Sequence, residues 1–181
     1  MLQIISLLLE NKPGALLRVT GLLGSRGYNI ESLTVARTLD PTLSRMTIVV
    51  DVDPKLYPQV IKQMNKLINV LQATDVSEAP LASRELVLLR VRVLPEGRTA
   101  VLKQAEIFGA RVIDSAPEGF VIEATGDAEK VEEFLEVMRS NGDIEVSRSG
   151  AVSIPPSNKK LRLQPPVSMT IPSRDREGVV S

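Results

Sequence analysis

The chain has 181 residues, in which 22 Lys and Arg balance 22 Asp and Glu, and its apolar content of 43% is that of an ordinary globular protein. It contains neither Cys nor His. This excludes disulfides, thiolate catalysis and every nucleophile that depends on a histidine base, and it removes the commonest metal ligands. We therefore expect no catalytic residue and no metal site, and the balanced charge gives no reason to expect a nucleic-acid partner.

The chain begins with a nearly continuous apolar run from residue 2 to residue 9. No basic segment precedes this run, and Glu10 follows it directly without a cleavage site of small residues, so it is unlike a signal peptide. No segment reaches the roughly 18 to 20 apolar residues that a membrane span needs. We expect the run to be a strand buried on both faces, in a cytoplasmic protein that has no membrane partner.

The first half of the chain alternates between patterns typical of strands and of helices. Pro13 suits the first turn of a helix, Val19 and Leu23 follow at helical spacing, and Gly27 is a natural left-handed residue to close the helix. The predicted strands cover residues 2–9, 29–37, 45–52 and 70–76, and the predicted helices cover residues 13–26 and 53–67. This is the β-α-β-β-α-β order of the split β-α-β motif.

The same order of patterns returns in the second half. The break at Pro95 and Gly97 echoes the break at Pro13 and Gly14, at an offset of roughly 83 residues. The predicted strands cover residues 85–93, 110–115, 120–124 and 144–146, and the predicted helices cover residues 100–108 and 126–141. We predict an α+β protein with two ferredoxin-like β-α-β-β-α-β domains in tandem, at residues 1–78 and 83–152.

Residues 155–181 differ in composition from the two predicted domains. They carry a net positive charge and show little periodicity, whereas the second domain is net negative. Their five prolines are Pro155, Pro156, Pro165, Pro166 and Pro172. This composition is typical of an extended or flexible tail, and a docking arm for a partner is the alternative.

The segment from residue 10 to residue 36 carries the most functional information. Gly14 lies at a predicted helix N-terminus, where unpaired N–H groups and the helix dipole favour a carboxylate, and the missing side chain lets a ligand approach. Asn11 and Asn29 could accept a hydrogen bond from an ammonium group or donate one to a carboxylate. The combination suits a free α-amino acid, although these residues could also serve only the turn and the local backbone.

Several segments resemble the family of small, regulatory subunits of acetolactate synthase, also called acetohydroxyacid synthase. They are LLENKPGAL at residues 8–16, RGYNIESLTV at 26–35 and DPTLSRMTI at 40–48, with REL at 84–86, EIF at 106–108 and SRSG at 147–150. The resemblance covers roughly residues 1–152 and does not extend to the proline-rich tail.

The resemblance implies an N-terminal ACT domain and a C-terminal ACT-like domain. Such subunits pair through their N-terminal domains and bind valine at that interface, and the matching positions here are Asn11, Gly14, Ala15, Asn29, Ile30 and Ala36. They bind a catalytic subunit that uses thiamine diphosphate, Mg²⁺ and FAD, raise its activity and confer feedback inhibition. The resemblance therefore implies a non-catalytic, homodimeric regulator without a cofactor of its own.

Three other functions deserve comparison. RNA-binding domains share the strand order but stack bases on aromatic residues of the central strands, and residues 2–9 and 45–52 contain no aromatic residue. An enzyme could use Arg90, Arg92, Glu123 and Glu145, although alternating charges are also typical of half-exposed strands. A free-standing amino-acid sensor that acts on another partner is the third alternative.

Overall fold

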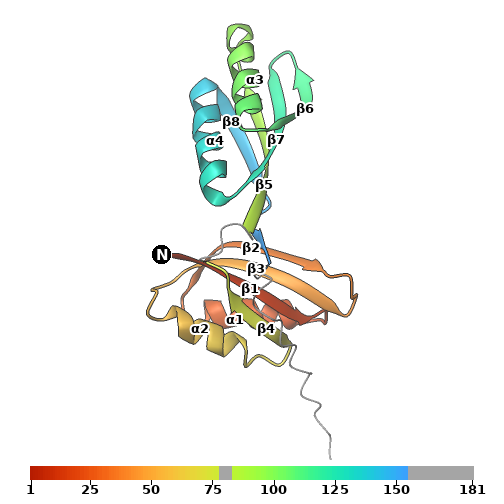
Figure 1. Ribbon diagram of the computed structural model, residues 1–181, viewed down its shortest axis with the longest axis vertical. Coiled ribbons are helices and arrows are strands. Elements are labelled where there is room, and N and C mark those ends of the chain that lie inside the picture. Colours follow the sequence, from red (N-terminus) through yellow and green to blue (C-terminus); the bar gives the residue numbers. More distant parts are fainter. Residues whose placement is uncertain (78–82, 155–181) are drawn as a thin grey trace, which may run out of the picture.

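The computed structural model describes residues 1–77 and 83–154, which form two units, each with an antiparallel sheet and two α-helices (Figure 1). The first unit contains β1 (Leu2–Glu10), α1 (Ala15–Gly24), β2 (Asn29–Arg37), β3 (Leu43–Asp51), α2 (Tyr57–Met64) and β4 (Val70–Asp75). The second contains β5 (Ser83–Arg92), the short 3₁₀ helix η2 (Pro95–Gly97), α3 (Arg98–Ile107), β6 (Arg111–Ala116), β7 (Gly119–Gly126), α4 (Ala128–Asn141) and β8 (Asp143–Arg148). The predicted α+β fold with two tandem β-α-β-β-α-β domains is confirmed, and the predicted tail at residues 155–181 lies outside the described residues.

The two sheets share one topology. Their strand orders are β2-β3-β1-β4 and β6-β7-β5-β8, and all of these neighbours are antiparallel. The strands β2 and β6 also have their register shifts at equivalent places, after Ile30 in one and after Val112 in the other. The internal repeat in the sequence therefore reflects two copies of one structural unit.

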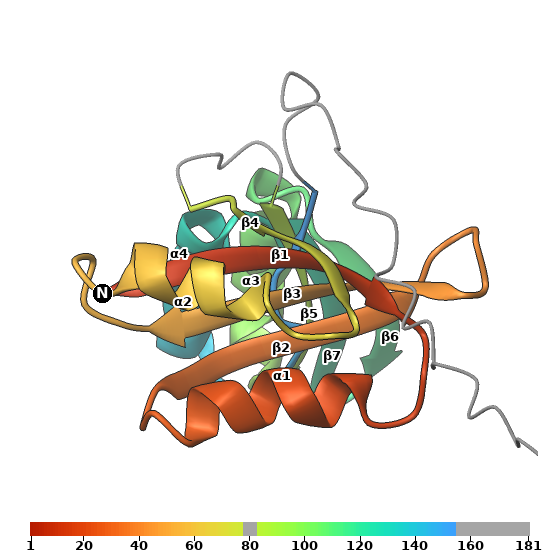
Figure 2. The same cartoon turned by 90° about the horizontal axis from the view of Figure 1, so that it is seen from below.

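Each unit has its own hydrophobic core between its sheet and its helices. In the first unit, Ile5 and Leu7 of β1 belong to the same buried cluster as Val19 and Leu23 of α1. Figure 2 shows α1 and α2 on one face of this sheet, the face turned away from the second unit in Figure 1. In the second unit, the ring of the buried Phe134 meets Phe108 edge to face, with the ring centroids 5.5 Å apart.

Both helices of the first unit begin later than the sequence pattern predicts. The helix α1 starts at Ala15 and not at Pro13, because Gly14 takes a left-handed φ of 81° and serves as the N-cap. The helix α2 starts at Tyr57, because the Asp53 carboxylate accepts a hydrogen bond of 2.8 Å from the backbone N–H two residues on and forms a turn of its own. Among the described residues, no helix has the length and apolar character needed to cross a membrane.

The regular part of α1 ends at Gly24, two residues earlier than predicted, but the predicted role of Gly27 as the left-handed residue that closes the helix is confirmed. Gly27 has a φ of 72°, its N–H donates to the Gly24 carbonyl at 3.0 Å, and the next N–H donates to the Leu23 carbonyl at 3.1 Å. This pair of bonds is a Schellman motif, which satisfies the last carbonyls of a helix. Gly109 closes α3 with a φ of 67° in the same way, so the two units repeat this detail as well.

A short segment of the chain lies against the second face of the first sheet. Residues 149–153, which we call the strap, follow β8, and β9 (Val152–Ser153) within the strap pairs with the start of β5. The strap also contacts β3, and Ser6, Leu8 and Thr47 on this face of the sheet are buried. The predicted burial of β1 on both faces is confirmed, since Leu7 on the helix side and Leu8 on the opposite side are both buried.

Candidate functional site

The start of α1 is built around Gly14. A Cβ added to Gly14 would meet no heavy atom within 4 Å beyond its neighbours in the chain, so the space in front of it is open. The Ala15 N–H donates to the Lys12 carbonyl at 3.2 Å, and Gly14 has no side chain with which to cap the helix. Because the first N–H groups of a helix lack intrahelical acceptors, this terminus could hold a small carboxylate.

Asn11 lies directly after β1 and joins the helix start to the β2–β3 turn. Its backbone N–H donates to the Thr42 carbonyl at 2.7 Å, and its side-chain amide donates to the Pro41 carbonyl at 3.0 Å. These bonds orient the exposed side chain and commit one of its donors. The amide oxygen remains the group that could accept a hydrogen bond from a ligand ammonium.

A polar cluster that the sequence reasoning did not include lies at the same end of β1. Lys12 Nζ is 2.9 Å from Glu10 Oε1, the Asn69 amide donates to Glu10 Oε2 at 2.8 Å, and Arg18 donates to Asn69 Oδ1. The hydrogen bonds from Lys12 and Asn69 lower the pKa of Glu10. Lys12 and Arg18 thus bring positive charge to the region of Gly14. Only the fold reveals that Glu10 and Asn69 link these two side chains through hydrogen bonds.

The remaining predicted residues lie on β2, at both of its ends. Asn29 begins the strand opposite Asp51, and Ile30 beside it packs against the first core. Ala36 lies opposite Arg45 near the other end, the end of the sheet at which Asn11 and Gly14 also lie. Seven residues of an extended strand span about 23 Å. One chain therefore brings Asn11, Gly14, Ala15 and Ala36 to one end of the sheet and leaves Asn29 and Ile30 at the other.

The edge of the first sheet at β2 is exposed and apolar. Within the described part of the chain, β2 has a hydrogen-bonded neighbour only on its β3 side. The exposed apolar side chains in this region are Leu16 and Leu17 of α1, Val35 of β2 and Leu39 of the following turn. An unpaired edge strand beside such side chains is suited to pairing with another chain.

The four charged residues that the sequence offers for an enzyme, Arg90, Arg92, Glu123 and Glu145, do not form one cluster on the second sheet. They belong to separate cross-strand pairs: Arg90 with Glu145 at 2.6 Å, Arg92 with Asp143 at 3.5 Å and Arg111 with Glu123 at 3.1 Å. Such exposed pairs are typical of a solvated sheet face. In the regions 1–77 and 83–154, no three or more Asp or Glu side chains are grouped so that they could hold a metal ion.

The two units are ACT-type domains. The first matches the family model described as "AHAS small subunit-like ACT domain" over residues 5–72, and the second matches the model described as "Small subunit of acetolactate synthase" over residues 84–156. A crystal structure of the acetolactate synthase small subunit from Thermotoga maritima is similar in fold, with a TM-score of 0.74 and 36% identity. The similarity covers 85% of this chain and 96% of that one.

Curated relatives agree with this assignment along most of the chain. A protein of Archaeoglobus fulgidus named "Probable acetolactate synthase small subunit" is 48% identical over 156 residues, which are 86% of this chain and 98% of that relative. The small subunit of acetolactate synthase isozyme 3 from Escherichia coli is 43% identical over 163 residues, 90% of this chain and all of that relative. The chain belongs to the family of acetolactate synthase small subunits.

Proposed function

We propose that this chain is the regulatory, non-catalytic subunit of an acetolactate synthase and that it binds valine between two copies of its first domain. The observation that carries the proposal is the division of the predicted site between the two ends of an unpaired edge strand, in a chain of this family. Neither end alone offers both an open helix terminus and the second asparagine. A twofold-symmetric dimer would complete the site.

Antiparallel pairing of β2 with the β2 of a second copy would bring the two half-sites together. In a pairing centred near Leu33, Asn29 of one copy lies opposite Arg37 of the other, next to Ala36. Two such sites form, each with Asn11 and Gly14 from one copy. The exposed apolar side chains around β2 would be buried by the same contact.

The residues in this arrangement suit each part of a branched-chain amino acid. The N–H groups of the first turn of α1 would donate to the ligand carboxylate, and the net positive charge of Lys12, Arg18 and Glu10 taken together favours an anion there. The side-chain oxygens of Asn11 and Asn29 would accept from the ammonium group. A small aliphatic side chain such as that of valine would lie near Ile30 and Ala36.

The partner in this proposal is the catalytic subunit in the cytoplasm, which would carry thiamine diphosphate, Mg²⁺ and FAD. The small subunit activates that partner, and valine inhibits by binding one arrangement of the complex more tightly than another. A typical coupling of about 1–3 kcal/mol changes an affinity roughly 5- to 150-fold.

Mixing two inactive variants tests the shared site. Gly14→Asp and Asn29→His should each abolish valine binding, because each damages one half of both sites. A mixed dimer contains one site in which both halves are intact, so random exchange of equal amounts should restore about a quarter of the wild-type number of sites. Isothermal titration calorimetry measures this number.

The control mixes Gly14→Asp with a chain that carries both changes, and no site should return. If the Gly14→Asp and Asn29→His mixture also restores nothing although exchange is shown by mass spectrometry, the site is not shared between copies. If both single variants still bind valine, the site itself is contradicted.

The regulatory role is tested by reconstitution. The isolated chain, supplied with pyruvate, thiamine diphosphate, Mg²⁺ and FAD, should form no acetolactate, and addition of a catalytic subunit should give activity above that subunit alone and sensitivity to valine. Copurification of the chain with an unrelated partner and not with an acetolactate synthase would instead favour a free-standing amino-acid sensor.

A further inference from the structure

We propose that the strap, residues 149–153, couples the edge strand β2 to the position of the second domain, so that valine at β2 is sensed beyond the first domain. This inference rests on the proposed function. It concerns how the signal leaves the site and not how the site is formed.

One end of the strap is anchored to the central strand β3. The Ser153 N–H donates to Thr47 Oγ1 at 3.0 Å, and the Ser153 hydroxyl lies 3.3 Å from the same oxygen. Both residues are only 2% exposed. Because a buried hydrogen bond without competing water is costly to break, this end of the strap moves with the core of the first domain.

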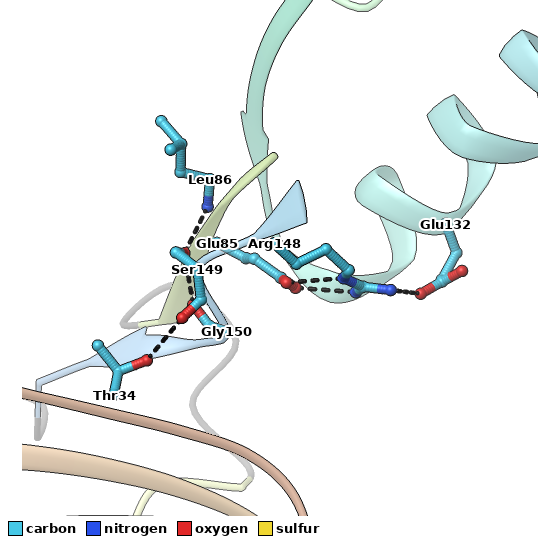
Figure 3. A network of polar contacts seen from close by, with 7 residues as sticks. All are labelled: Thr34, Glu85, Leu86, Glu132, Arg148, Ser149 and Gly150. Carbon is cyan, nitrogen blue, oxygen red and sulfur yellow. Dashed lines mark hydrogen bonds and ion pairs between the residues drawn. The ribbon is translucent and has the colours of Figure 1, made fainter. Parts of the chain in front are cut away.

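The other end of the strap contacts the edge strand β2. The Thr34 hydroxyl donates to the Ser149 carbonyl at 3.1 Å, and this contact is exposed (Figure 3). Gly150 has a φ of 77°, and a Cβ added to it would lie 3.0 Å from Ser32 Cβ and 3.1 Å from Thr34 Oγ1. The strap backbone therefore packs directly on β2, two residues from Ala36 of the proposed site.

The residues at the β2 contact are tied firmly to the second domain. The Ser149 N–H donates to the Leu86 carbonyl at 3.0 Å, and the Leu86 N–H donates to the Ser149 hydroxyl at 3.1 Å. Arg148 donates to both carboxylate oxygens of Glu85, at 2.8 and 2.9 Å, and to Glu132 of α4 at 2.5 Å (Figure 3). A displacement of the strap at β2 would therefore carry β5, β8 and α4 with it.

The space beside the strap would allow such a movement. A cleft of about 780 Å³ lies between the two domains, with Ile4, Leu33 and Val49 of the first sheet on one side and Glu85 and the start of α4 on the other. This open volume would give the second domain room to rotate about the buried Thr47 anchor. Valine bound at the β2 edge would then favour one position of the strap on β2 over another.

The substitution Gly150→Ala tests the contact with β2. It combines left-handed backbone strain with a close approach to Ser32 and Thr34, so it should lift the strap from β2. Gly109→Ala is the matched control, because Gly109 has a φ of 67° in the same domain and open space around its Cβ position. The control carries the strain without the contact.

The measurement is the dissociation constant of valine for the small subunit alone and for its complex with the catalytic subunit. Binding linkage is reciprocal, so in the wild type and in Gly109→Ala the two constants should differ by about 5- to 150-fold. In Gly150→Ala the constant for the free subunit should stay within about twofold of wild type, and the two constants should become equal.

Other outcomes contradict the inference in distinct ways. An unchanged ratio in Gly150→Ala would mean that the strap does not carry the signal, and weaker valine binding to the free variant would make the strap part of the site itself. If wild type does not bind valine, the proposed function fails first. Should Gly150→Ala not fold, Thr34→Val removes the hydroxyl that donates to the Ser149 carbonyl without adding bulk and must also bring the ratio to one.

Discussion

The guanidinium of Arg98 lies over the ring of Phe120, with its central carbon 4.1 Å from the ring centroid, and it donates to the Ala116 carbonyl at 2.7 Å. Arg98 is the first residue of α3, so these contacts tie the start of the helix to the β6–β7 turn. The N-cap residue of α3, Gly97, has no open space at its Cβ position, because a Cβ there would approach a Val93 methyl group to 2.7 Å. The first helix of the second domain thus lacks the open N-terminus that Gly14 gives α1, which supports assigning the proposed site to the first domain only.

Gly14→Asp should abolish valine binding and leave much of the activation of the catalytic subunit. Its carboxylate would bring negative charge to the place proposed for the ligand carboxylate, while itself capping α1. Thermal unfolding measures the effect, since valine at about 100 times its dissociation constant should stabilise the wild type by about 2.7 kcal/mol and the variant by nothing.

Gly109→Asp is the control for this substitution. Gly109 has a similar left-handed φ and no heavy atom within 4 Å of its Cβ position, so the strain and the added charge are alike. It should keep full stabilisation by valine. An equal loss in both variants would point to strain, and an unchanged valine effect in Gly14→Asp would contradict the site.

The sequence predicted the two domains because each element follows a periodic pattern of several turns or alternations. The run at residues 2–9 even indicated burial on both faces. The contact of β9 with this second face could not be predicted, because β9 has two residues and so no period, and its bond to Thr47 joins positions 106 residues apart.

The site was predicted unevenly for a similar physical reason. The open helix terminus at Gly14 follows from local rules for glycine and helix ends, although its left-handed φ placed the helix start two residues later than expected. The residues Asn11 and Asn29 were grouped from the chemistry of their amides and from the resemblance, and not from their positions in the fold. Only the strand register shows that they lie at opposite ends of one sheet, which is what makes a second copy necessary in the proposal.

The nearly buried Glu85 should contribute far more to stability than its exposed counterpart Glu145. Glu85 is 8% exposed and holds Arg148 through two hydrogen bonds, whereas Glu145 pairs with Arg90 in solvent. We expect Glu85→Gln to lower the free energy of unfolding by about 1–3 kcal/mol, and Glu145→Gln by about 0–1 kcal/mol. Urea denaturation of the two variants measures the difference, and equal effects would contradict it.

Tyr57 should make the stability of the first domain sensitive to alkaline pH. Its hydroxyl lies 2.9 Å from the Ile4 carbonyl oxygen and 3.1 Å from an Asp75 carboxylate oxygen, and burial raises its pKa well above the ordinary value. A raised pKa in the folded state means that the stabilisation is fully present below the pKa of the unfolded state, about 10, and is lost as pH rises beyond it.

The substitution Tyr57→Phe isolates this effect. At pH 7 the wild type should exceed the variant in free energy of unfolding by about 0.5–1.5 kcal/mol, the contribution of a typical hydrogen bond. The difference should shrink as the pH rises above about 10. Because Tyr28 and all other titrating groups are present in both proteins, a difference that stays constant or grows with pH would refute the role given to Tyr57.

The separate cores predict that the second domain can be weakened without loss of the proposed valine site. Phe134 is fully buried against Phe108, and no residue of its cluster belongs to the core of the first domain. Phe134→Ala should destabilise the second domain by about 3–5 kcal/mol, whereas Leu23→Ala should destabilise the first by about 2–5 kcal/mol. Calorimetry should then resolve two unfolding transitions in Phe134→Ala. Valine should raise the midpoint temperature of the first domain's transition only, which is the transition that Leu23→Ala shifts to lower temperature. A single transition that valine and both substitutions shift together would show that the two domains unfold as one cooperative unit.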